Sequence, residues 1–537
     1  MARTQLARMI GTMFAHRDGG APAERRDRFG RREFLTRGAA LGVGVGAVAL
    51  GAGAALPAAA GQPERIAIVG AGISGLAAAL QLRDKGITAN VYEANRRVGG
   101  RMFSTVPGSY WAAGQVSEWG GELIDTDHTL IQDLAHRFGL ALDDLRAAMP
   151  AGATDTYYFD GRYYSYARAS ADFEPVYAAL QRDLDSFDYP VTYDSDASPA
   201  GIALSNMTVY EWIESRVPGG HRSHFGRLLD VAYTIEFGAQ TTEQTALGLL
   251  GLLGYQAAPG DFDMFGTSDE RYHIRGGNQQ LPRAIAATLP ADTVRFGWRL
   301  VAIAVNADDT QTLTFAGEGG SRTVTADHTI LAVPLGVMKR IDFSRARFDA
   351  RKRATYEAMP MGVNGKLQLQ FDSRSWNGTG AWPGRSTGES YADTGYQNTW
   401  DVSRAQPGAQ GILVDFLGGD VARSFAPAHA FGSSDNPKIR AYARRFLDQI
   451  EPVYPGLTAR WNGKALLSTW YLNPYSFGSY SYWPTGYCQY YAGYEGVRQG
   501  NVHFAGEHCS VNYQGYMEGG AEEGLRAAKE IITDLGR

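Results

Sequence analysis

Cysteine is scarce in this chain of 537 residues, in which only Cys488 and Cys509 occur. Two cysteines exclude a multi-disulfide framework and a paired-cysteine metal site, so we interpret them as free thiols, with one disulfide as the alternative. The ten histidines show no H-E-x-x-H or other paired ligand spacing, which predicts no catalytic metal. The sequence also lacks a G-x-S-x-G elbow and any basic, aromatic stripe, so we expect neither serine-hydrolase chemistry nor a nucleic-acid partner.

Glycine, by contrast, is abundant. The 66 glycines make up about 12% of the chain, compared with a usual ~7%, and indicate many tight turns and close backbone approaches to a ligand. At this length, with 44% hydrophobic residues, we expect about two to three globular units. Residues 1–60 contain nine arginines and four acids, whereas the remainder carries 42 basic and 52 acidic residues. The acidic remainder is compatible with a cationic ligand.

Residues 1–60 are predicted to be a signal peptide. Arg31 and Arg32, followed by Glu-Phe-Leu, are typical of a twin-arginine signal, and Ala58-Ala59-Ala60 matches an A-x-A cleavage site. The alternative is a membrane anchor, but the apolar run at 39–56 is short and about two-thirds Gly plus Ala. We therefore expect export by the twin-arginine route to the periplasm or the medium, with no stable membrane span anywhere in the chain.

A complete β-α-β unit follows the signal. The apolar run 66–69 breaks into Gly70-x-Gly72-x-x-Gly75, an Ala/Leu-rich helix is expected over 76–85, and a second strand over 88–93. In such a unit the first glycine makes the turn, the second lets the backbone approach a pyrophosphate, and the third permits close helix–strand packing, while an acid at the end of the next strand accepts hydrogen bonds from a ribose. The predicted dinucleotide contacts are Gly70, Gly72, Ile73, Ser74, Gly75 and Glu93.

The next segment narrows the choice of dinucleotide. Arg97-Val98-Gly99-Gly100-Arg101 resembles the R-x-G-G-R extension of the flavin-containing amine oxidase superfamily, which nicotinamide dehydrogenases lack. In that family the extension holds FAD, with the second arginine near the pyrophosphate; here that residue is Arg101. Trp119-Gly120-Gly121-Glu122 resembles the family's next segment, so Gly120, Gly121 and Glu122 are expected beside the flavin.

The resemblance recurs at the far end of the chain. Residues 502–508 resemble the closing strand, with Gly506 and Glu507 at the ribityl chain, and 514–519 resemble the flavin-capping turn, where a helix begins near Met517. Its N-terminal N–H groups would favour negative charge on the flavin's pyrimidine edge. Val301 resembles the position whose backbone contacts the adenine.

The resemblance covers residues 64–535 and implies an α/β fold. We expect a Rossmann-like FAD-binding domain, discontinuous in sequence, with an inserted α+β substrate-binding domain. The expected FAD-binding segments are 63–137, 272–346 and 473–537, and the expected substrate-binding segments are 138–271 and 347–472.

The resemblance also implies catalytic residues. Lys366, in the alternating stretch 363–371, corresponds to the lysine that holds a water against flavin N5. Tyr480 and Tyr516 correspond to a pair of tyrosines that steer the amine toward N5. Ser479 stands where monoamine oxidases carry the cysteine that links the flavin covalently, so we expect non-covalent FAD.

The leading hypothesis is thus an exported FAD-dependent amine oxidase. Hydride would pass from the amine-bearing carbon to flavin N5, the imine would hydrolyse to an aldehyde or ketone plus ammonia or an amine, and O2 would be reduced to H2O2.

The main alternative is an L-amino-acid oxidase of the same fold. That branch grips the carboxylate with an arginine shortly after the Gly-Gly segment, where this chain has Glu122, although an arginine of the inserted domain could substitute. A flavin-binding protein without turnover and a desaturase-type flavoprotein are further alternatives, and a homodimer is compatible with the resemblance.

Overall fold

The computed structural model describes residues 64–537. The predicted signal peptide, residues 1–60, lies outside the described residues. No helix between residues 64 and 537 combines the length and the apolar character needed to cross a bilayer. Cys488 and Cys509 are both buried thiols and are not joined in a disulfide, which agrees with the interpretation as two thiols.

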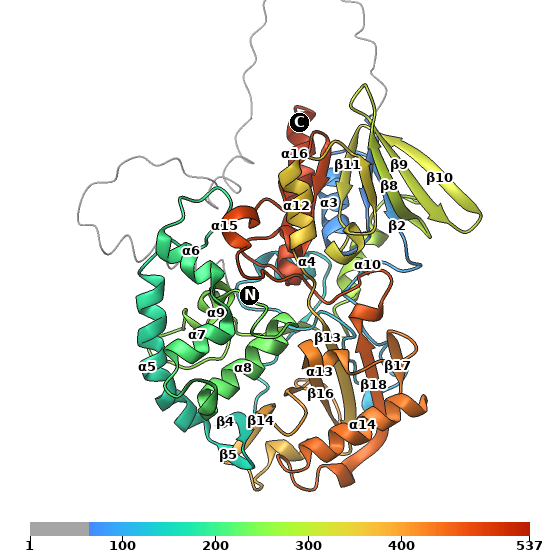
Figure 1. The fold of residues 1–537 in the computed structure, drawn as a ribbon. Helices are drawn as coiled ribbons and strands as arrows, with labels where there is room; N and C mark the ends of the chain where they lie inside the picture. Colours follow the sequence, from blue (N-terminus) through green and yellow to red (C-terminus); the bar gives the residue numbers. More distant parts are fainter. Residues whose placement is uncertain (1–63) are drawn as a thin grey trace, which may run out of the picture. The chain divides into compact units, whose positions relative to one another are not determined.

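A five-stranded parallel sheet draws strands from the start, the middle and the end of the chain (Figure 1). Each strand pairs with its neighbours in parallel register. In spatial order the strands are β19 (Val502–Phe504), β11 (His328–Leu331), β1 (Ile66–Val69), β2 (Ala89–Glu93) and β7 (Val294–Phe296). A parallel sheet with β1-α-β2 at its centre is the Rossmann-like arrangement, so the predicted α/β fold class is confirmed.

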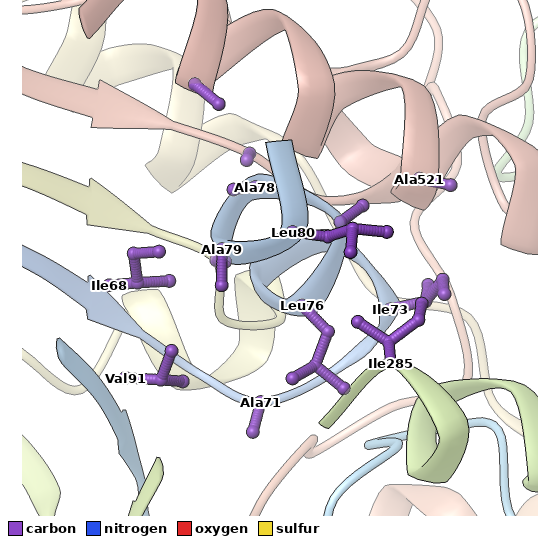
Figure 2. Packing of buried hydrophobic residues seen from close by; sticks show 14 of the residues in the cluster. Ile68, Ala71, Ile73, Leu76, Ala78, Ala79, Leu80, Val91, Ile285 and Ala521 are labelled. Atoms are coloured by element: carbon purple, nitrogen blue, oxygen red, sulfur yellow. The ribbon is translucent and has the colours of Figure 1, made fainter. Parts of the chain in front are cut away.

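Helix α3 (Ile73–Asp84) is buried between this sheet and helix α16 (Met517–Asp534). Figure 2 shows α3 side chains between Ile68 and Val91 of the sheet and Ala521 of α16. The helix is apolar on nearly every face because it is covered on both sides. Small residues let the two helices approach closely, since a Cβ at Gly524 of α16 would lie 2.0 Å from the Ser74 carbonyl oxygen.

The described residues form two halves, one built on this parallel sheet and the other on a larger, eight-stranded sheet. In spatial order its strands are β17 (Phe431–Ser433), β18 (Trp461–Thr469), β13 (Asn364–Phe371), β16 (Gly411–Gly418), β15 (Asn398–Asp401), β14 (Arg385–Ala392), β4 (Ala153–Phe159) and β5 (Arg162–Tyr164). Strand β13 is fully buried and pairs antiparallel with both β16 and β18. Because β13 is held between two neighbouring strands, the positions of its side chains on the face toward the parallel sheet are fixed.

The remaining elements complete the two halves. A four-stranded sheet contains β10 (Gly320–Ala326), β9 (Gln311–Gly317), β8 (Arg299–Val305) and β12 (Asp342–Arg345), and β3 (Leu142–Asp144) pairs with β6 (Tyr272–Ile274). The other α-helices are α4 (Thr129–Arg137), α5 (Tyr166–Leu184), α6 (Pro199–Asn206), α7 (Val209–Arg216), α8 (His224–Phe237), α9 (Ala246–Leu253), α10 (Gln280–Ala287), α11 (Leu335–Met338), α12 (Ala350–Ala358), α13 (Gly419–Arg423), α14 (Pro437–Ile450) and α15 (Cys488–Tyr491). Helices α5 to α9 lie together beside the end of the large sheet that carries β4 and β14 (Figure 1).

Candidate active site

One cavity of about 550 Å³ brings most of the predicted site residues together. The predicted residues that line it are Gly70, Gly72, Ile73, Ser74, Glu93, Arg101, Gly120, Gly121, Glu122, Lys366, Tyr480, Gly506, Glu507, Tyr516 and Met517. Gly75 and Val301 do not line it; the cavity instead reaches the neighbouring Arg299 and Leu300 of β8. The site thus draws on segments that lie hundreds of residues apart in the sequence.

The glycine turn has the shape that a dinucleotide needs. Gly70 has φ +105°, and a Cβ there would lie 2.5 Å from the Ala332 carbonyl oxygen. A Cβ on Gly75 would lie 2.0 Å from the Gly70 carbonyl oxygen, so Gly75 packs the helix against the turn, as predicted. Gly72, by contrast, has open space where a Cβ would point. The hydroxyl of Ser74, at the start of α3, is buried with no hydrogen-bond partner among the described residues. Open space and an orphan donor at a helix N-terminus fit a phosphate.

Helix α3 begins at Ile73, three residues earlier than the predicted 76. The reason is that Gly72 already has the extended conformation of an N-cap, and the Leu76 N–H donates to its carbonyl. The first helical N–H groups therefore belong to residues of the glycine motif itself, and two of these residues, Ile73 and Ser74, line the cavity.

Glu93 stands at the end of β2, as predicted for a ribose ligand. Its two carboxylate oxygens accept hydrogen bonds of 2.7 Å from the backbone N–H groups of Ala71 and Asn95. Burial raises the pKa of this carboxyl, and the two N–H groups counteract that effect. The carboxylate is thus held rigidly at the cavity wall.

Arg101 connects the N-terminal motif to the C-terminal segment. Its Nη1 donates to Glu507 Oε1 and to the Ser479 carbonyl oxygen, each at 2.8 Å. Glu507 also accepts from the N–H and hydroxyl of Ser481 and from the N–H of Gly515, at 2.8 to 3.1 Å. Burial alone would raise the pKa of Glu507, but Arg101 holds it below its usual value. Glu507 is therefore an anchor for this region, and its contact with a ribityl chain stays a prediction.

Lys366 is 6% exposed and lies in the middle of β13. Strand alternation points Leu367 and Leu369 into a hydrophobic core, which leaves Lys366 on the cavity side. Its Nζ donates to Glu122 Oε2 at 2.6 Å, and Trp400 Nε1 donates to Glu122 Oε1 at 3.0 Å. The pairing of Glu122 with Lys366 was not predicted, because the two residues are 244 positions apart.

Tyr480 and Tyr516 both line the cavity, and each is held by its hydroxyl. Tyr480 donates to the Glu236 carbonyl oxygen at 2.6 Å. The Tyr516 hydroxyl lies 3.1 Å from Ser268 Oγ, which in turn donates to Asp125 Oδ2. Burial raises the pKa of Tyr480 well above its usual range, so this phenol stays neutral at physiological pH.

Asn278 supports the Gly-Gly segment and was missed by the sequence analysis. Its side-chain amide donates to the carbonyl oxygens of Gly121 and Glu122 at 3.1 and 2.7 Å, and a Cβ on Gly121 would lie 3.1 Å from the Met517 side chain. The adjacent Gly276-Gly277 pair, both with positive φ, is the one local signal that could have pointed to it.

Comparison with known proteins agrees with this geometry. The family described as flavin containing amine oxidoreductase matches residues 73–532. The L-amino-acid oxidase of Mus musculus is 24% identical over 493 residues, which cover 88% of this chain and 72% of that protein. The probable flavin-containing monoamine oxidase A of Dictyostelium discoideum is 24% identical over 489 residues, covering 88% and 98%. The structure of cyclohexylamine oxidase from Brevibacterium oxydans shares the fold, with a TM-score of 0.72 and 24% identity over 89% of this chain and all of that one.

Proposed function

Because the chain belongs to the flavin containing amine oxidoreductase family, we propose that it is an exported, FAD-dependent amine oxidase. The observation that carries the proposal is the convergence of the dinucleotide cradle, Lys366, Tyr480 and Tyr516 on one cavity. When bound, FAD would take a hydride from the amine-bearing carbon and pass the electrons to O2, giving H2O2. The resulting imine would hydrolyse to an aldehyde or ketone plus ammonia or an amine.

The protein's own groups would bind the cofactor and orient the amine. The N–H groups at the start of α3 and the Ser74 hydroxyl would hold the diphosphate, and Glu93 would hold a ribose. Lys366 supplies a positive charge at a buried position that its ion pair with Glu122 fixes. The Tyr480 and Tyr516 rings, held by their hydroxyls, would restrict the path of the amine.

The test of this function is an anaerobic one. Purified, flavin-loaded protein is mixed with panels of amines and L-amino acids while the flavin absorbance is followed, and peroxide is measured after O2 is admitted. Bleaching by at least one amine, followed by stoichiometric peroxide, is the expected result. If nothing in either panel bleaches the flavin, the chain is a flavin-binding protein without this activity.

The second candidate is an L-amino-acid oxidase, which one observation favours. Arg404, from the other half of the molecule, lines the cavity, is 9% exposed, and has an Nε with no acceptor within residues 64–537. Such an arginine could bind a substrate carboxylate. The carboxylates of Asp155 and Glu389 interact with Arg404, however, and offset its charge. This balance favours amines, and the two panels decide between the candidates.

We predict that the FAD is not covalently attached. Ser479, at the position of the covalent cysteine in the resemblance, is buried and donates its hydroxyl hydrogen bond to Asn364 Oδ1 at 2.6 Å. Neither Cys488 nor Cys509 lines the cavity. Precipitation with trichloroacetic acid should therefore leave the yellow colour in the supernatant. Flavin that stays in the protein pellet would contradict the prediction.

Export is predicted to depend on Arg31 and Arg32. The twin-arginine route carries folded proteins, which suits a chain that binds its cofactor before leaving the cytoplasm. The Arg31→Lys, Arg32→Lys double variant should accumulate in the cytoplasm with its flavin bound, as measured by cell fractionation and flavin absorbance. Unchanged export of the double variant would mean that residues 1–60 have another role.

A further inference from the structure

A group of five carboxylic acids lines the part of the cavity formed by β4, α8, β14 and the loop before β6. Its members are Asp155, Glu236, Asp263, Glu270 and Glu389, which we call the acid cluster. They come from four separate stretches of the chain, and their charges act on one another. Glu270 interacts with Glu236, Asp263 and Glu389, and Glu389 interacts with Asp155.

If all five acids of the cluster were ionised, their negative charge would exceed the positive charge that lines the same part of the cavity. Two arginines, Arg146 and Arg404, line the same part of the cavity and interact with cluster members. Five acids face these two cations. Burial, followed by repulsion from the neighbouring acids, raises the pKa of Glu389 to about 8, and burial raises that of Glu236 to about 8 and that of Asp263 to about 7. A cation placed among these groups would restore their ionised forms.

Glu236 gives independent evidence of a missing ligand. Its side chain is 4% exposed, lines the cavity, and has an Oε1 atom with no hydrogen-bond partner in the described part of the chain. Asp155 and Glu389, by comparison, accept hydrogen bonds from Thr387 and Tyr391. Leaving a buried carboxylate oxygen without a partner is unfavourable, so the arrangement fits a site that a donor completes.

The position of Glu236 relates the acid cluster to the catalytic region. Its carbonyl oxygen accepts the hydrogen bond that orients Tyr480, and the electrostatic influence of both Glu236 and Glu270 reaches the Tyr480 phenol. An elongated molecule whose reacting carbon lies near Tyr480 can therefore place its far end among these acids.

We propose that the acid cluster binds a second cationic group of the substrate, so that the protein prefers aliphatic amines that carry a further protonated amino or guanidinium group. This inference rests on the proposed amine oxidase function. The shared chemistry is the distal cation, which a diamine and a basic amino acid both possess. The test separates these two sources.

The first experiment compares matched substrate pairs in the presence of EDTA, which keeps divalent cations out of the acid cluster. The pairs are 1,4-diaminobutane with butylamine, 1,5-diaminopentane with pentylamine, and L-lysine with L-norleucine. We expect kcat/KM to be at least tenfold higher for the dicationic member of a pair. A preference confined to the amino-acid pair identifies a basic amino acid as the substrate, whereas one in the first two pairs identifies a diamine. Equal or better turnover of all three monocationic members overturns the inference.

A second experiment measures binding without turnover. The unfolding temperature of the flavin-loaded protein should rise with 1,4-diaminobutane or L-lysine and not with the matched monocation. If no amine is oxidised but this selective rise is observed, the acid cluster stands and the proposed function fails. If amines are oxidised but both members of every pair raise the unfolding temperature equally, the acid cluster inference fails and the function stands.

Variants connect the selectivity to the acid cluster. Glu236→Gln and, separately, Glu389→Gln keep the side-chain shape and remove one charge, and each should reduce the dication-to-monocation ratio of kcat/KM at least tenfold. Glu174→Gln, an exposed position on α5 outside the cavity, makes the same charge change and should leave the ratio unchanged. Ratios in both cluster variants within twofold of that of Glu174→Gln would overturn the assignment.

Discussion

Lys366→Met is expected to slow amine-dependent flavin reduction, flavin reoxidation by O2, or both, by ~10²–10³, which corresponds to about 3–4 kcal/mol of barrier. The effect should be on rate and not on cofactor binding, because the glycine turn, Glu93 and Arg101 belong to other elements. Lys366 lies on β13 and provides a fixed charge inside a buried cavity. Such a preorganised charge matters when electrons arrive or leave, since water cannot reorganise to replace it.

The measurement is stopped-flow kinetics of both half-reactions, with the flavin spectrum reporting cofactor retention. Lys366→Met leaves Glu122 as a buried carboxylate without its cation, so Lys366→Met combined with Glu122→Gln is the necessary companion. Persistence of the rate loss in the double variant assigns it to the lysine charge. Lys85→Met, at the exposed end of α3, is the control and should behave as wild type. Rates within about threefold of wild type in Lys366→Met would remove Lys366 from the catalytic machinery.

The cofactor half of the site could be predicted because its signals are local. The spacing from Gly70 to Gly75 and the acid at Glu93 belong to one continuous β-α-β unit, so short-range geometry specifies where each residue lies. The far-end residues Glu507 and Met517 could be located only through the family resemblance. The structure brings both to the same cavity as the glycine turn.

The substrate half could not be predicted in the same way. The pairing of Lys366 with Glu122 depends on the register of β13 between β16 and β18, which no short motif encodes. The acid cluster was even harder to predict, because Glu236 and Glu389 each resemble ordinary charged residues in the sequence. Their burial, and the interaction of each with Glu270, exist only after strands and helices from distant segments have packed together.

Arg101→Met is expected to destabilise the protein by about 3 kcal/mol and to weaken flavin retention. Glu507 is 4% exposed, and Arg101 is the cation that holds its pKa low, so the variant leaves a buried carboxylate with neutral partners only. We expect a destabilisation at the lower end of the usual ~3–5 kcal/mol, because 24% of the Arg101 side chain is exposed to solvent. The measurement is urea unfolding of the flavin-free proteins, together with the flavin-to-protein ratio after dialysis.

Addition of Glu507→Gln to Arg101→Met should recover most of the lost stability. The amide needs no counter-charge, and its single oxygen can still accept from the Ser481 hydroxyl and the Gly515 N–H, so removing both charges costs much less than removing one. The control is Arg168→Met, which breaks the solvent-exposed pair of Arg168 with Asp172 and should change stability by less than about 1 kcal/mol. If Arg101→Met and Arg168→Met are equally mild, the ion pair of Arg101 with Glu507 does not hold the two ends of the chain together. If the double variant is as unstable as Arg101→Met alone, the loss comes from the bond between Arg101 and the Ser479 carbonyl rather than from the stranded charge.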